Sequence, residues 1–147
     1  MLRTFAAVAM LVSLTGCGGE TGPKKHPVTG RVDVNGNPAL YVRVQFLHAD
    51  QSLPGNLKMP VGMTDDSGVF HLSTTGDKDG AVEGDYTVVF EWMSANDLGA
   101  FDKFGGKFSN AKTSTFKVKV EAKRNELAPF ELTIPEAAIA TKSPRGQ

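Results

Sequence analysis

The sequence lacks several features that would narrow its class at once. Its 147 residues hold a single cysteine, so no internal disulfide can form and the fold must rest on its core. Lys plus Arg number 16 and Asp plus Glu number 16, so the chain has no excess of either sign. Nucleic-acid binding needs clustered cationic charge, and we therefore expect no nucleic-acid partner.

Glycine and proline are plentiful, with 16 and 8 residues. Frequent turns favour many short strands over long helices. The length of the chain predicts one folded domain.

The first residues follow the layout of a secretory signal peptide. Arg3 supplies a positive start, residues 5–14 are apolar and uncharged, and Thr15 and Gly16 are small. The apolar run is about half of the ~20 residues that a membrane-spanning helix needs. We therefore predict a signal peptide over residues 1–16 and no permanent span.

The lone cysteine directly follows this segment. The letters LTGC at 14–17 resemble the lipobox of bacterial lipoproteins. That resemblance implies a diacylglycerol on the Cys17 thiol, cleavage just before it and further acylation of the new amino group. Several acyl chains anchor a protein stably, whereas one does so only marginally. The alternative is an ordinary signal peptide with an incidental cysteine.

The lipobox interpretation predicts where the protein is located and one molecule that it is attached to. We expect a protein of the bacterial cell envelope, tied to membrane lipid through Cys17. The expected site is the outer membrane, on its periplasmic or surface side. Residues 17–27 are rich in Gly, Pro and charge and predict a flexible tether, whereas residues 136–147 predict a disordered tail.

The segment between tether and tail, residues 28–135, carries strand patterns. Residues 28–34 alternate apolar and polar, and Asn35-Gly36 is a strong hairpin signal because both residues tolerate positive φ. Residues 40–48 are predicted as the return strand of that hairpin. Further strands are expected at 60–64, 69–74, 85–93, 114–122 and 127–135, with a turn formed by Asp65 and Gly68.

Seven short strands at regular spacing predict an all-β fold, a seven-stranded antiparallel Greek-key β-sandwich. Alternation places one set of side chains inside. We expect the core to include Phe70, Leu72, Tyr86, Val88, Phe90, Trp92, Phe130, Leu132 and Ile134.

Three segments taken together, 28–46, 62–72 and 80–92, resemble the carboxypeptidase regulatory-like, or transthyretin-like, domains. They hold a G-x-V strand, an N-G-x-P turn, a T-D-x-x-G-x-F segment and a G-x-Y-x-V strand in that order. The resemblance implies a prealbumin-like sandwich with a structural or binding role and no cofactor. Related hydrolases end in Y-R-G-S, whereas this chain ends in S-P-R-G-Q, so we expect no enzyme.

Two sets of polar residues are candidates for a metal site. Asp77, Asp79 and Glu83 share one loop, and hard cations such as Ca²⁺ favour several nearby carboxylates. Polar turn chemistry explains the same residues more simply. The histidines at 26, 48 and 71 show no metal-ligand spacing and are expected at the surface, the first in the tether.

A loop rich in aromatic residues is the main candidate binding element. Phe101, Phe104 and Phe108 stand among glycines and lysines in residues 96–109. Exposed aromatic rings on a loop mark binding surfaces for a glycan or a protein. The alternative is that these rings fold back and cover an open edge of the sandwich.

These observations lead to one functional hypothesis and one alternative. The first is a membrane-anchored envelope lipoprotein whose β-sandwich acts as a non-catalytic structural or binding module. The alternative is a carbohydrate- or peptide-binding accessory module of a secreted enzyme system, acting through the loop at 96–109.

Overall fold

The structure is a computed structural model that describes residues 22–143. The predicted signal peptide, Cys17 and the last four residues lie outside the described residues. The described chain forms eleven strands and two 3₁₀ helices and has no α-helix in this range. The all-β prediction is confirmed.

The elements are short, as the turn-rich composition predicts. The longest strands are β2 (Val28–Val34), β4 (Val42–His48) and β8 (Gly84–Trp92). The others are β1 (Lys25–His26), β3 (Asn37–Pro38), β5 (Val61–Met63), β6 (Val69–His71), β7 (Ala81–Val82), β9 (Lys117–Val120), β10 (Asn125–Glu126) and β11 (Phe130–Leu132), with the 3₁₀ helices η1 (Gly55–Leu57) and η2 (Glu136–Ala138).

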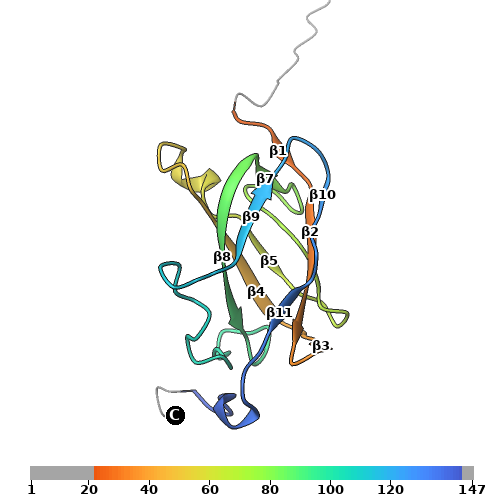
Figure 1. The fold of residues 1–147 in the computed structure, drawn as a ribbon, viewed down its shortest axis with the longest axis vertical. Helices are drawn as coiled ribbons and strands as arrows, with labels where there is room; N and C mark the ends of the chain where they lie inside the picture. Colours follow the sequence, from red (N-terminus) through yellow and green to blue (C-terminus); the bar gives the residue numbers. More distant parts are fainter. Residues whose placement is uncertain (1–21, 144–147) are drawn as a thin grey trace, which may run out of the picture.

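Two larger sheets share one core (Figure 1). The first is built around β2, which pairs with β3, β6, β10 and β11, and the second has the order β5-β4-β8-β9. A bridge between Val61 and Ser73 joins the sheets along the β5–β6 side. A separate pair, β1 with β7, closes one end of the domain.

The core lies between the two sheets and is rich in aromatic rings. Phe70 of β6, Phe90 of β8 and Phe130 of β11 are in ring contact, with Phe90 and Phe130 centroids 5.2 Å apart. The predicted inward residues are buried, except that Trp92 is only half-buried. Period-2 patterning therefore gives the correct inner face of the strands.

The first hairpin matches the prediction at its turn and differs in its return strand. Asn35 and Gly36 have φ of 52° and 80°, as an Asn-Gly turn requires. The return strand is the two-residue β3, whereas β4 belongs to the other sheet. Where the chain leaves the first sheet, the buried Thr64 hydroxyl donates to the Ala39 carbonyl and accepts from the Val42 N–H.

The pairing is not wholly antiparallel, which corrects the purely antiparallel arrangement expected above. β10 and β11 run parallel to β2. After β9 the chain crosses from the second sheet to the first and so runs alongside β2 in the same direction. The Asn125 side chain shapes this crossing, since it accepts from the Glu121 N–H at 2.9 Å and donates to the Glu121 and Lys123 carbonyls.

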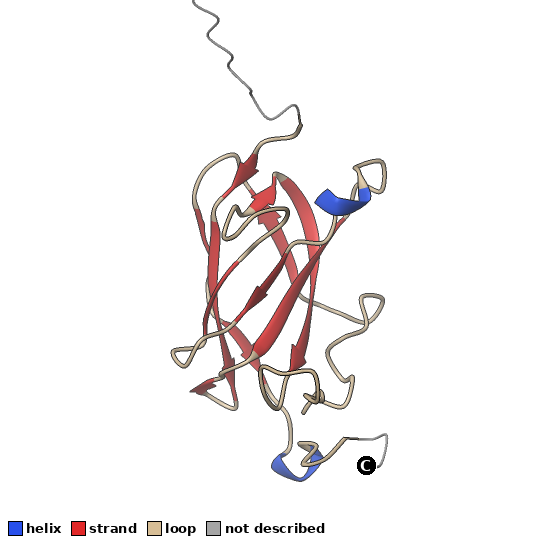
Figure 2. Cartoon of the chain, turned by 180° about the vertical axis from the view of Figure 1, so that it is seen from behind, coloured by secondary structure: helices blue, strands red, loops and turns tan. Residues whose placement is uncertain are grey.

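Both ends of the domain are more ordered than predicted. Lys25–His26 forms β1 within the expected tether, and His26 is only 8% exposed. At the other end, Glu136–Ala138 forms η2, and Ile139 packs against the core although it lies in the expected tail. The described chain enters at one end of the long axis and leaves at the other (Figure 2). We call these the proximal and the distal end.

Candidate functional site

A pocket opens at the distal end, among the β2–β3 turn, the end of β8 and the C-terminal segment. Its volume is about 430 Å³, within the range of small-molecule sites. We call it the distal pocket. Its lining combines apolar Val34, Pro38, Ala39, Trp92 and Ile139 with polar Asn35, Asn37, Glu136 and Thr141.

Trp92, the single tryptophan of the chain, is the last residue of β8 and is half-buried. Its indole Nε1–H donates to the Leu40 carbonyl at 3.0 Å. The Lys103 ammonium lies 3.4 Å from the centre of the ring, in cation–π contact. The only donor of the indole is thus already bonded, and the Lys103 ammonium covers one face of its ring.

An unusual backbone conformation positions the Leu40 carbonyl. Tyr41 has a φ of 63°, which is uncommon for a residue with a side chain of this size. Its N–H donates to the Thr64 carbonyl, and its own carbonyl accepts from the Met93 N–H at 2.9 Å. Conformations of this kind are often found beside functional sites.

The loop after β8 is organised by one carboxylate. Asp102 Oδ1 accepts from the N–H groups of Trp92 and Phe104 at 2.8 and 2.9 Å, and its Oδ2 accepts from that of Gly106 at 2.8 Å. The Lys103 N–H returns a bond to the Trp92 carbonyl. These bonds hold the Lys103 side chain beside the indole.

The remaining walls are also fixed by hydrogen bonds. The Asn35 side chain donates to the Ile134 carbonyl at 2.9 Å and accepts from the Ile134 N–H at 3.0 Å. The Ala140 N–H donates to the Lys103 carbonyl at 2.9 Å and so ties the C-terminal segment to the loop after β8. The distal pocket is thus preformed from three segments far apart in sequence.

The charges at the distal pocket have opposite signs. Partial burial lowers the pKa of Lys103 from its ordinary value. Glu136 is exposed, and its carboxylate has no hydrogen bond or ion pair within the described residues. The pocket therefore presents one carboxylate with amide and hydroxyl groups, and the Lys103 ammonium lies outside its lining, on the Trp92 ring.

A larger hollow lies at the proximal end. Its volume is about 1110 Å³, and residues 22–25 form one wall, where the chain enters the domain. None of its lining residues is aromatic, and Lys25 and Asp79 in its wall form an ion pair of 2.8 Å. It is a space beneath the entering chain and offers no aromatic ring for stacking.

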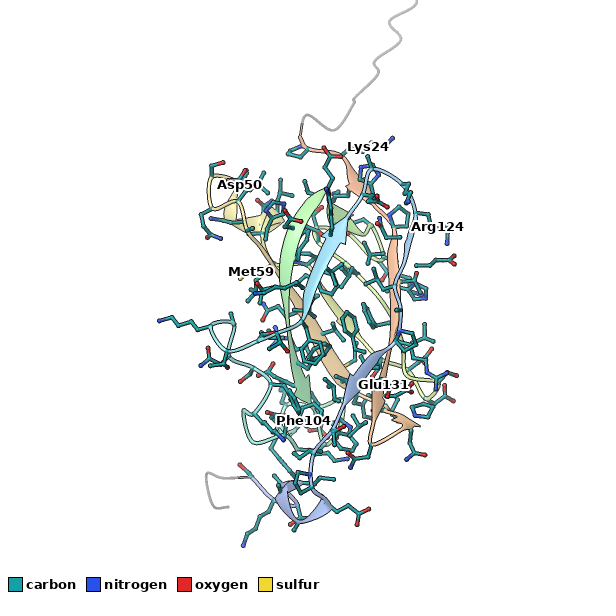
Figure 3. The ribbon with its side chains drawn as sticks, in the orientation of Figure 1. Lys24, Asp50, Met59, Phe104, Arg124 and Glu131 are labelled. Carbon is teal, nitrogen blue, oxygen red and sulfur yellow. The ribbon has the colours of Figure 1, made fainter. Side chains whose placement is uncertain are left out.

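The predicted phenylalanine loop contributes packing. Phe104 is 2% exposed, belongs to the core and lies 5.5 Å from the Trp92 ring, and Phe108 packs against the same cluster. Phe101 is half-buried, and its backbone exchanges hydrogen bonds with Ser94. Phe104 does not present its ring to solvent, which favours the alternative in which the ring covers the sandwich. Figure 3 shows Phe104 and Lys24 at opposite ends of the domain.

The acidic loop is used for turn structure. The Asp79 carboxylate accepts from the backbone N–H groups of Thr74, Thr75 and Gly76 and pairs with Lys25. Asp77 and Glu83 are exposed. In the described part of the chain, no three His, Cys, Asp or Glu side chains gather as a metal site. Asp77, Asp79 and Glu83 are therefore not brought together as calcium ligands.

Two of the three histidines are buried, which corrects the prediction that all lie at the surface. His48 is 7% exposed, and its Nδ1 accepts from the Asp50 N–H at 2.9 Å. This bond places the proton on Nε2, which faces the Glu83 carbonyl at 3.1 Å. His48 is therefore a structural residue of the proximal end, as is His26.

The sequence did not reveal the distal pocket. Trp92 fits the inward pattern of its strand, and only its position at the strand end indicates that one side of it is open. Ile139 and Glu136 fall within the predicted tail, although the apolar residues AAIA at 137–140 indicate a packed turn. No sequence pattern predicts the contacts of Leu40 and Lys103 with Trp92, because these contacts depend on the backbone turns that bring the residues together.

Comparisons with known proteins leave the family open. No protein-family model and no curated protein sequence matches the chain. A solved structure of a DUF3823 family protein from Parabacteroides merdae has a TM-score of 0.47 at 14% identity, covering 76% of this chain and 47% of that one. This chain therefore spans less than half of that protein's length.

Two further solved structures share part of the strand arrangement. One is described as a "putative carbohydrate binding protein" from Pseudomonas aeruginosa, with a TM-score of 0.43, 12% identity, and coverage of 77% of this chain and 90% of that one. The other is a 9R-lipoxygenase from Cyanothece, with a TM-score of 0.39, 14% identity, and coverage of 84% and 18%. At these scores neither assigns a function here, and the transthyretin-like resemblance stays a prediction.

Within residues 22–143, no helix has the length and hydropathy of a membrane-spanning segment.

Proposed function

We propose that the protein is a lipid-anchored envelope protein whose β domain is a non-catalytic binding module. An acylated Cys17 holds it at the proximal end, and the distal pocket binds the ligand. The observation that carries the proposal is the placement of the pocket at the end of the domain opposite to the entry of the chain.

The distance between lipid and domain suits such an arrangement. Residues 18–24 separate Cys17 from β1, and an extended chain of this length reaches about 25 Å. That reach clears the headgroup layer and leaves the domain in water. Multiple acyl chains on Cys17 supply stable anchoring.

The proximal end is built to hold the entering chain. β1 pairs with β7 in the register Lys25↔Val82 and His26↔Ala81, and Lys25 also pairs with Asp79. These contacts fix the point at which the tether leaves the domain. The distal pocket lies at the opposite end of the domain from this point.

The composition of the distal pocket supports binding. One aromatic ring, several apolar side chains and a few polar groups line a cavity of ligand size. Internal hydrogen bonds fix its walls, which lowers the entropic cost of binding.

The anchor is tested by the intact mass of full-length protein extracted from bacterial membranes, with Cys17→Ala as the control. We expect the wild-type mass to equal a chain beginning at Cys17 plus a diacylglycerol and a further acyl group. The control is expected in the soluble fraction. Wild-type protein recovered unprocessed and unacylated would contradict the proposal.

A further inference from the structure

We propose that the distal pocket binds a pyranose ring of a glycan, with a C–H face of the sugar on the Trp92 indole and hydroxyl groups on Asn37 and Glu136. This inference rests on the proposed function, because it names the ligand class of the same pocket. It follows from the match between the two surfaces of a sugar and the two kinds of side chain that line the cavity.

The aromatic part of the pocket is suited to stacking. The Trp92 Nε1–H is bonded to Leu40, so the indole does not require a hydrogen-bond acceptor from the ligand. The Lys103 ammonium, 3.4 Å from the ring centre, covers one face of the indole and shows that the ring attracts positive charge, so the sugar lies against the part of Trp92 that lines the pocket. The C–H groups on the face of a pyranose carry the same partial charge and are apolar enough to leave water for an aromatic surface.

The polar part of the pocket is suited to hydroxyl groups. Glu136 accepts hydrogen bonds, and the Asn37 amide both donates and accepts. Both residues are exposed, and the Glu136 carboxylate has no protein partner within the described residues. Bonds between a charged acceptor and hydroxyl groups are among the stronger hydrogen bonds of a site.

A peptide that binds as an added strand fits the same pocket less well. That mode of recognition relies on main-chain N–H and C=O groups of the receptor. Several backbone groups beside this pocket are already bonded inside the protein: the Leu40 carbonyl with Trp92, both Ile134 groups with Asn35, and the Ala140 N–H with Lys103. What remains for a ligand is the ring and the polar side chains.

The test uses Trp92 emission as a direct probe, since the chain has one tryptophan. Full-length protein is titrated with cellohexaose, maltohexaose, chitohexaose and oligogalacturonate. The first three are neutral, and the last carries carboxylates that can meet the Lys103 ammonium. We expect a saturable shift of Trp92 emission with at least one saccharide.

Two variants connect such a shift to the pocket. Glu136→Gln and Asn37→Ala each remove a surface group and are expected to weaken binding about tenfold without lowering the Tm. Glu126→Gln, an exposed carboxylate on β10 near the proximal end, serves as the matched control with unchanged affinity. No emission shift with any of the four saccharides would overturn the inference, as would a shift that Glu136→Gln leaves unaltered.

A parallel titration with a short apolar peptide covers the other ligand class. A shift with the peptide and none with the saccharides would also overturn the inference. The outcome is distinct from that of the anchor test. If the protein is acylated but binds no saccharide, only the proposal of a sugar site is refuted. If it is not acylated but binds a saccharide, only the proposal of a lipid anchor is refuted.

Discussion

The proximal and distal ends of the domain differ in how they use their polar groups. At the proximal end, Asp79 meets three backbone N–H groups and Lys25, and both ring nitrogens of His48 have partners. At the distal end, the Glu136 carboxylate has no partner within the described residues, and Trp92 is only half-buried. One end uses its polar side chains for the fold, and the other leaves some of them for a ligand.

The proximal end therefore stabilises the fold, whereas the distal end leaves side chains accessible to a ligand. Buried polar groups that are fully paired make an end rigid, because breaking any pair leaves a costly unsatisfied group. An aromatic ring that is only half-buried gains less burial energy than a fully buried one, and a ligand that covers it adds to that gain.

The largest effect is expected for Gly80→Ala at the proximal end. Gly80 has a φ of +85°, and a Cβ there would lie 1.9 Å from the His26 carbonyl oxygen. We expect a loss of about 3–5 kcal/mol in the free energy of unfolding and release of β1. Urea denaturation and hydrogen exchange measure the two effects.

The control for this variant is Gly55→Ala. A Cβ at Gly55 would meet nothing within 4 Å. The free energy of unfolding should change by less than about 0.5 kcal/mol. Equal stability of the two variants would show that β1 does not dock as described.

The second effect concerns Asp102→Ala at the distal end. Three backbone N–H groups lose their acceptor, and we expect a loss of about 2–3 kcal/mol together with a red shift of Trp92 emission. Asp97→Ala is the control, since Asp97 accepts from Gly99 in an exposed loop. A normal Trp92 emission in Asp102→Ala would argue against the role of this carboxylate.

The third effect appears in alkali and depends on Tyr86 near the proximal end. Burial raises the pKa of Tyr86 to about 12. The phenol ionises near pH ~10 in the unfolded chain, so this stability is complete below pH 10 and is lost as the pH rises toward 12. We expect a loss of about 2 kcal/mol over that range, measured by urea denaturation.

Tyr86→Phe should lack this alkaline slope. At pH 7 it should cost about 1 kcal/mol, because the Val82 carbonyl loses its donor at 2.8 Å. Slopes that agree between variant and wild type would disprove the assignment to Tyr86.

The fourth effect appears in acid and depends on Asp79. Partial burial alone raises the pKa of this carboxyl, but the Lys25 ammonium and the Thr74 and Thr75 N–H groups outweigh it and hold the pKa well below its ordinary value. The resulting stability, about 1–2 kcal/mol, is present above pH ~4 and is lost as the pH falls further. Asp79→Asn should flatten this part of the curve.

The control for the acid limb is Asp66→Asn, which changes an exposed carboxylate. It should retain the wild-type loss of stability. The account of the Lys25–Asp79 pair fails if the two variants give the same acid limb.

The smallest effect is expected for Lys103→Met. The ammonium over Trp92 contributes about 0.5–1 kcal/mol, and its removal should change the emission of Trp92. Lys112→Met, on an exposed part of the long loop, should alter neither quantity. Matching spectra for all three proteins would rule out the cation–π contact.

Local sequence signals predicted the turns and the inner faces of strands. Asn35-Gly36 adopts the expected positive φ, and the Asp65 carboxylate bonds the N–H groups of Ser67 and Val69 in the expected turn. Alternation correctly placed Phe70 and Tyr86 in the core. These features depend on residues within a few positions of one another, which is why the sequence reveals them.

The arrangement of distant segments was beyond such signals. The parallel pairing of β10 and β11 with β2 joins residues about a hundred positions apart. The distal pocket likewise needs Asn37, Trp92 and Glu136 to meet at one end of the domain. An alternating pattern shows which face of a strand is inward, but it does not show where the strand ends relative to its neighbours.

The proposal places the lipid anchor at the proximal end of the domain and the ligand pocket at the distal end. The most direct test is to measure whether Trp92 lies in water or in the bilayer when the protein is bound to a membrane. Acylated full-length protein is reconstituted into phospholipid vesicles, and Trp92 emission is followed with brominated acyl chains and with aqueous acrylamide. The account predicts quenching by acrylamide and none by the brominated lipid. Strong quenching by the brominated lipid would place the distal pocket in the bilayer and contradict it.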